Sequence, residues 1–154
     1  CALVITRQDL LTLHKAKYED FSKGAYYAKY NESSVYTIIA TGSEVELAMH
    51  LKEELLKSYI EARVVSMPNM NLFLKQDKDY QEQVLPTGYR RMVIELSNDA
   101  NWYRFISSDE DFIGTFKYGK SGSEFDNLTY YEMDILFGII QQYILRTIQK
   151  KINL

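Results

Sequence analysis

Residues 35–68 decide the class of fold and read VYTIIATGSEVELAMHLKEELLKSYIEARVVSMP. The run Val35–Thr41 is rich in β-branched residues, and a second such run covers Ala62–Met67. Between them, Glu44–Ser58 repeats apolar residues at spacings of three and four, which is typical of an amphipathic helix. Strand, helix and strand in this order predict a βαβ unit with parallel strands.

The helix over Glu44–Ser58 is expected to bury one face. That face carries Ala48, Leu51, Leu55 and Tyr59. Ser43 and Glu46 have the spacing of a capping box, which predicts that the helix begins after Ser43. The preceding turn, Thr41-Gly42-Ser43, lies at a helix N-terminus, where free amides bind anions. Because Glu44 and Glu46 would repel a phosphate there, capping is the favoured role of this turn.

The same alternation continues on both sides of this unit. Further β-rich runs cover Ala2–Thr6, Ala25–Lys29, Met92–Leu96 and Phe112–Gly114. Asn69–Leu85, between two prolines, predicts one or two short helices, and Lys29–Ser34 predicts a hairpin-like connection. Thr129, followed by Glu132, predicts the start of a last helix. The pattern indicates an α/β domain with a mostly parallel sheet.

Composition excludes several classes of protein. The 154 residues are 46% hydrophobic and 25% charged with a net charge of -3, which suits one globular domain without nucleic acid as a partner. The apolar run Ile135–Ile140 is too short to span a membrane. Cys1 is the single cysteine, so no intrachain disulfide forms and a reducing, cytoplasmic setting is expected. Since the chain does not begin with methionine, we expect a piece of a longer protein.

One stretch fits the phosphate-loop pattern G-x-x-x-x-G-K-[ST], namely Gly114–Ser121, GTFKYGKS. A phosphate loop opens directly into a helix, whereas Gly122 and Ser123 interrupt any helix here. The favoured interpretation is a surface turn. Nucleotide binding that disappears in Lys120→Ala would support the alternative, a nucleotide-binding domain.

Other reactive side chains form no recognisable catalytic or metal-binding pattern. His14 and His50 lack the spacing of a zinc site. The stretches Asp77-Lys78-Asp79 and Asp109-Glu110-Asp111 lack the glycine and distal glutamate of a calcium loop, so solvated loop charge is the expected role. Trp102 is predicted to pack against the sheet rather than to form a binding platform.

Several stretches occur together in one order along nearly the whole chain. They are LVITRQ at Leu3–Gln8, IATGSEV at Ile39–Val45, RVVSMP at Arg63–Pro68, Glu95 ahead of Trp102-Tyr103-Arg104, and YGKSG at Tyr118–Gly122. In this combination the chain resembles the third, C-terminal domain of the transketolases. Asp9, Asn101 and Ser123 depart from the family pattern, at loop positions.

The resemblance implies a three-layer α/β/α sandwich around a mostly parallel five-stranded sheet with one antiparallel edge strand. It also implies a division of the chain, with residues 1–22 as the last strand and connecting segment of the preceding pyrimidine-binding domain. Residues 23–154 would then form the C-terminal domain. Transketolases transfer a two-carbon ketol unit between sugar phosphates in the pentose phosphate pathway, as homodimers with thiamine diphosphate and Mg²⁺ or Ca²⁺.

The resemblance assigns one site residue, because the arginine of LVITRQ, here Arg7, contacts the sugar phosphate in whole transketolases. The G-D-G motif that holds the metal and diphosphate in the family is absent here. We therefore expect this chain alone to bind no cofactor, to carry no catalytic residue and to be inactive without the remaining domains. The alternatives are a domain of deoxyxylulose phosphate synthase or dihydroxyacetone synthase, and a stand-alone nucleotide-binding or regulatory module.

Overall fold

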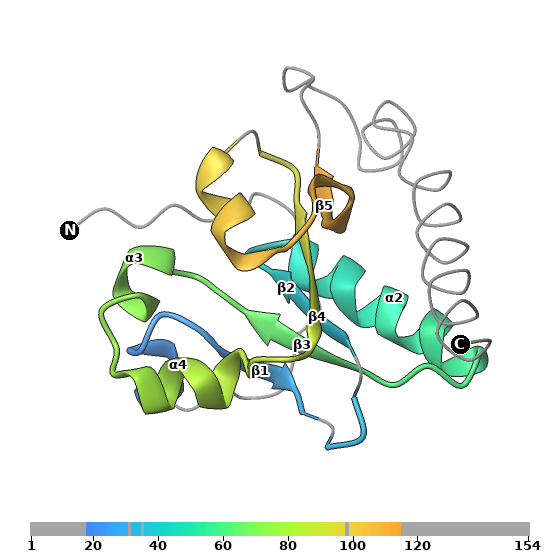
Figure 1. Cartoon of the computed structure of the whole chain (residues 1–154), viewed down its shortest axis with the longest axis horizontal. Helices are drawn as coiled ribbons and strands as arrows, with labels where there is room; N and C mark the ends of the chain where they lie inside the picture. The colour runs from blue at the N-terminus through green and yellow to red at the C-terminus, as the bar shows by residue number, and fades with distance from the viewer. Residues whose placement is uncertain (1–17, 31, 35, 98, 115–154) are drawn as a thin grey trace.

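The computed structural model describes residues 18–30, 32–34, 36–97 and 99–114, which form a sheet with helices on both faces (Figure 1). The sheet has five strands in the order β1-β3-β2-β4-β5. The strands are β1 Tyr26–Lys29, β2 Tyr36–Ala40, β3 Ala62–Ser66, β4 Arg90–Glu95 and β5 Phe112–Gly114. The α-helices are α1 Tyr18–Phe21, α2 Glu44–Lys57, α3 Met70–Phe73 and α4 Lys78–Val84, and the 3₁₀ helices are η1 Ala100–Phe105 and η2 Asp109–Asp111.

The strand pairing confirms the predicted sheet. β2 is parallel to β3 and β4, β5 is parallel to β4, and β1 is antiparallel to β3 at the edge. The hairpin-like connection over Lys29–Ser34 was wrong, because β3 lies between β1 and β2. β1 and β2 follow each other along the chain but therefore occupy non-adjacent places in the sheet.

Alternate residues of the central strands point into two separate apolar clusters, one on each face of the sheet. Ile38, Val64 and Met92 pack with the apolar side of α2. Ile39 and Val93 pack on the other face, among residues from α3, α4 and η1. Strands that are apolar on both faces require cover on both, which gives the three predicted layers.

The apolar face of α2 is as predicted except at its end. Ala48, Leu51 and Leu55 are buried, whereas Tyr59 is 96% exposed, so its placement on this face was wrong. The helix stops at Lys57, and Tyr59 takes a left-handed φ of 60°. The amide of Ile60 then donates to the Leu55 carbonyl at 3.0 Å, as in a Schellman motif. Ile60 is buried in place of the tyrosine.

The start of α2 lies where the sequence predicts it, but the capping box was wrong. Ser43 has helical angles, φ -64° and ψ -29°, and its side chain makes no capping hydrogen bond. Its Oγ instead donates to Oε2 of Glu44 at 3.1 Å. The side chain of Ser43 therefore forms its hydrogen bond with the neighbouring carboxylate and not with the free amides of the helix.

Asn69–Leu85 forms two short helices, α3 and α4, within the range that the sequence allows. Asn69 caps α3 by accepting from the Leu72 amide at 2.9 Å, and Asp77 caps α4 by accepting from the Tyr80 amide at 2.7 Å. Asp77 is exposed, as expected of solvated loop charge, and has the additional role of capping α4.

Some predictions fall outside the described residues. They are the strand Ala2–Thr6, Arg7, the last helix beginning at Thr129, and all of the phosphate-loop match after Gly114. Among the helices that the structure describes, none has the length and apolar character to cross a bilayer.

Candidate functional site

Two carboxylates lie where the order of the parallel strands reverses. From β2 the chain passes to β3 on one side, and then crosses to β4 on the other side of β2. In open parallel sheets, ligands bind in the crevice beyond the carboxyl ends of strands at such a switch point. Glu44 follows the end of β2, and Glu95 is the last residue of β4.

Both side chains are buried, with exposed fractions of 9% for Glu44 and 8% for Glu95. Glu44 accepts from Oγ of Ser43, and Glu95 accepts from the amide and hydroxyl of Ser97. Oε2 of Glu95 is buried and has no hydrogen-bond partner within the described part of the chain. A buried acceptor without a hydrogen bond destabilises the fold, because the hydrogen bonds that it made to water are lost and not replaced.

The environment favours the protonated forms of these two groups. Burial raises the pKa of Glu95 to about 7, and the nearby negative charge of Glu44 contributes to the shift. Burial also raises the pKa of Glu44, while hydrogen bonds from its own amide and from Ser43 oppose the shift. Glu95 can therefore exchange a proton near neutral pH, and both side chains can accept hydrogen bonds.

Sequence reasoning missed this pair. Glu44 was noted only as a charge in the first turn of a helix, and Glu95 only as part of a family pattern. The available signal was that each acid closes or directly follows a β-rich run, since the carboxyl ends of parallel strands share one edge of a sheet.

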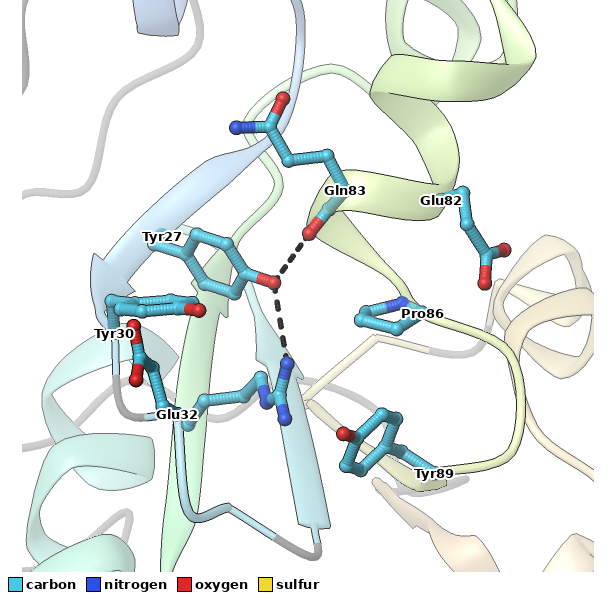
Figure 2. A pocket seen from close by; sticks show the side chains of 8 residues that line it. Tyr27, Tyr30, Glu32, Glu82, Gln83, Pro86 and Tyr89 are labelled. Atoms are coloured by element: carbon cyan, nitrogen blue, oxygen red, sulfur yellow. Dashed lines mark hydrogen bonds between the residues drawn. The ribbon is translucent and has the colours of Figure 1, made fainter.

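A cavity of about 500 Å³ opens elsewhere, between β1, the start of β3 and the end of α4 (Figure 2). It is lined by Tyr27, Tyr30, Glu32, Arg63, Glu82, Gln83, Pro86 and Tyr89. The hydroxyl of Tyr27 donates to the carbonyl of Gln83, which ties β1 to α4 across the cavity.

Arg63 is one of the residues that line this cavity and is only 3% exposed. Its guanidinium donates to the Ser34 carbonyl at 3.1 Å and to the Tyr27 hydroxyl at 3.5 Å. It also lies 4.2 Å from the ring centroid of Tyr89. Two glutamates of the lining oppose a strongly anionic ligand, so we assign Arg63 to anchoring the β1–β2 connection.

The remaining predicted side chains have structural positions. Trp102 is buried against the sheet and packs near Phe105, as predicted. Asp111 was wrongly taken as solvated loop charge, because it is buried and pairs with Arg90 at 2.7 Å. His50 is exposed on α2. In residues 18–114 as far as the structure describes them, no three His, Cys, Asp or Glu side chains are placed to hold a metal ion.

Comparison with known proteins agrees with this architecture. Residues 24–134 match the family described as the transketolase-like TK C-terminal domain. The chain is 41% identical over 122 residues to a probable transketolase of Streptococcus pneumoniae, which covers 78% of this chain and 18% of that protein. It is 40% identical over 125 residues to a transketolase of Halalkalibacterium halodurans, which covers 78% of this chain and 19% of that protein.

Solved structures agree with the sequence relatives. Transketolase from Pichia stipitis superposes with a TM-score of 0.75 at 32% identity, over 82% of this chain and 18% of that one. The Campylobacter jejuni transketolase gives 0.69 at 31% identity, over 82% and 19% of the two chains. The chain thus spans less than a fifth of the length of the relatives it matches. These matches favour neither the related thiamine enzymes nor a nucleotide-binding module, and the chain belongs to the transketolase family, as its C-terminal domain.

Proposed function

We propose that this chain supplies the C-terminal domain of an enzyme that transfers a two-carbon ketol unit between sugar phosphates. The observation that carries the proposal is the agreement in both sequence and fold with transketolases over about four-fifths of the chain. One of these relatives, from Pichia stipitis, has been solved in complex with sedoheptulose 7-phosphate. The activity requires the remaining domains of the polypeptide, because the chain matches less than a fifth of each relative.

The finer parts of the proposal follow from family membership. The complete enzyme uses thiamine diphosphate and Mg²⁺ or Ca²⁺, works as a homodimer in the cytoplasm, and serves the pentose phosphate pathway. Within the chain, residues 1–22 belong to the end of the preceding domain and residues 23–154 to the C-terminal domain. The family match beginning at residue 24 supports this division.

Arg7 is the residue through which this chain would touch substrate. A guanidinium stays charged at every physiological pH and meets two phosphate oxygens with a planar pair of N–H donors. Its position, in the stretch LVITRQ ahead of the C-terminal domain, supports a place beside the phosphate of the bound sugar.

Arg7→Ala in the complete enzyme is expected to raise KM for phosphorylated sugars far more than for unphosphorylated ones. Losing a charge-assisted hydrogen bond costs about 1.5–3 kcal/mol, or roughly tenfold to a hundredfold in affinity. Steady-state kinetics with ribose 5-phosphate and with ribose as acceptors measure the difference. Lys57→Ala, at an exposed position on α2, is the control and should leave both constants unchanged. Equal losses on the two acceptors would refute the phosphate role.

The chain by itself is expected to show no ketol transfer from xylulose 5-phosphate to ribose 5-phosphate, even with thiamine diphosphate and Mg²⁺ added. The physical reason is that the sequence lacks the G-D-G motif with which the family holds metal and diphosphate. A coupled assay, with the complete enzyme as positive control, measures this. Turnover by the chain alone would show that its part in catalysis is assigned wrongly.

A further inference from the structure

The elements α3, α4 and η1 cover one face of the sheet (Figure 1). Their residues, together with Arg91 of β4, line a groove. Its volume is about 360 Å³, within the range of small-molecule sites in proteins. The lining residues that carry the argument are Phe73, Lys78, Glu82, Arg91, Arg104 and Phe105.

Three basic side chains reach this groove from three different elements. Lys78 begins α4, Arg91 belongs to β4, and Arg104 belongs to η1. Neither of the ion pairs Lys57–Glu54 and Arg90–Asp111 involves any of the three. Against one carboxylate, that of Glu82, they leave the groove with two positive charges in excess, in a chain whose net charge is -3.

Glu82, the acidic residue that lines the groove, forms its hydrogen bonds with Thr87, which is not among the lining residues. Oε1 of Glu82 accepts from the amide of Thr87 and Oε2 from its hydroxyl, both at 2.6 Å. These bonds lower the pKa of Glu82 and fix its carboxylate on the turn after α4. The positive charges of the other rim residues are therefore only partly compensated.

Arg91 is held in place before any ligand arrives. One of its terminal nitrogens donates to the carbonyl of Leu85 at 2.6 Å and to that of Pro86 at 3.2 Å. Burial lowers the pKa of Arg91, opposed by the charge of Glu82, so an anion beside it would offset part of the desolvation. A guanidinium oriented in advance loses little entropy on binding an anion.

The floor of the groove is apolar. Phe73 and Phe105 are buried with ring centroids 6.3 Å apart, and the aliphatic side chains of Leu74 and Leu85 complete the lining. Phe73 also packs edge-on to Tyr80. Cations around an aromatic floor suit a ligand that combines an anionic group with a flat or apolar body.

We infer that this groove is a binding site for a small phosphate monoester that carries an apolar or aromatic group. The two excess positive charges match the charge of a phosphate dianion. The guanidinium groups of Arg91 and Arg104 are matched better by the oxygens of a phosphate ligand than by those of a carboxylate ligand. The apolar body rests on Phe73 and Phe105. Such a site is a property of the C-terminal domain and goes beyond the proposed ketol transfer.

Isothermal titration of the full chain with phenyl phosphate, inorganic phosphate and benzoate tests the assignment. Phenyl phosphate is expected to bind most tightly, because it alone uses both the cations and the apolar floor. The double variant Lys78→Gln/Arg104→Gln changes two exposed positions and should weaken phenyl phosphate binding by roughly tenfold or more. Lys57→Gln, which removes an exposed charge on α2, should leave the affinity unchanged.

Three results would overturn the assignment. One is the absence of phenyl phosphate binding at millimolar concentration, and the second is equal affinity in the wild type and the double variant. The third is phenyl phosphate binding no tighter than inorganic phosphate, which would mean an adventitious ion only. Circular dichroism of the double variant shows whether a loss of binding comes with an intact fold.

Discussion

Replacing Glu95 with glutamine is expected to make the protein more stable than the wild type at alkaline pH. The unfolding free energy of the wild type falls as pH rises, and that of the variant should fall less. The pKa of Glu95 goes from the usual 4.5 to about 7 in the folded protein, mainly through burial. Each pKa unit corresponds to about 1.4 kcal/mol, so ionised Glu95 costs the fold about 3 kcal/mol. Glutamine keeps the shape and the acceptor for Ser97 without the charge.

The wild type loses stability as pH rises because the folded state holds the Glu95 proton more tightly than the unfolded state does. Below the unfolded pKa both states are protonated, so this group removes no stability. As pH rises, the unfolded chain loses the proton first, and stability falls until the folded Glu95 has also ionised above about pH 7. The gain of the variant over the wild type should therefore grow from about 1 kcal/mol near pH 5 to about 3 kcal/mol near pH 8.

Urea unfolding of both proteins at several pH values measures this gain. Glu53→Gln changes an exposed carboxylate on α2 and should follow the wild type throughout. Glu44→Gln removes the charge that helps to raise the pKa of Glu95, and should reduce the slope only in part. A Glu95→Gln variant with the slope of the wild type would mean that Glu95 is not a buried proton-exchanging group.

The elements that could be predicted from the sequence are those set by local pattern. The alternation of β-rich and helical segments located the described strands, and β5 spans the residues predicted for it. The apolar spacing of α2 identified Ala48, Leu51 and Leu55 as buried. These features depend on periodicities of two and 3.6 residues, which neighbouring residues specify by themselves.

The predictions were wrong where residues distant in the sequence determine the local structure. The β1–β2 hairpin failed because β3, which comes later in the chain, inserts between the two strands. Ser43 does not cap α2 because its hydroxyl donates to the buried carboxylate of Glu44. The burial of Glu44 depends on the fold as a whole. Tyr59 was assigned to the apolar face because it follows Leu55 by four residues, but the helix ends at Lys57 and Tyr59 takes a left-handed φ.

The candidate sites were less predictable than the fold for the same reason. Glu44 follows β2 and Glu95 ends β4, and these two strands are neighbours only in the folded sheet. The ion pair of Asp111 needs Arg90 from β4. The basic groove draws Lys78, Arg91 and Arg104 from three separate elements. No local spacing connects such residues, so sequence patterns alone could not place them together.

Gly24, just ahead of β1, lies close to the backbone of α3 and of Asn69 before it. Its φ is +90°, and a Cβ added there would lie 2.4 Å from the Asn69 carbonyl oxygen and 2.5 Å from the Phe73 amide nitrogen. The Gly24 carbonyl also accepts from the Asn69 amide at 3.0 Å. Gly88 has nearly the same φ, +89°, but nothing lies within 4 Å of an added Cβ.

Gly24→Ala is therefore expected to cost more than about 3 kcal/mol of unfolding free energy, against about 1 kcal/mol for Gly88→Ala. Both variants introduce the same strain in φ, so the difference between them isolates the clash of Cβ with the backbone of α3. That backbone cannot rotate aside as a flexible side chain would, and moving it would disturb Phe73 in the core. Denaturant unfolding of both variants measures the two costs, and equal values would mean that α3 yields to the methyl group.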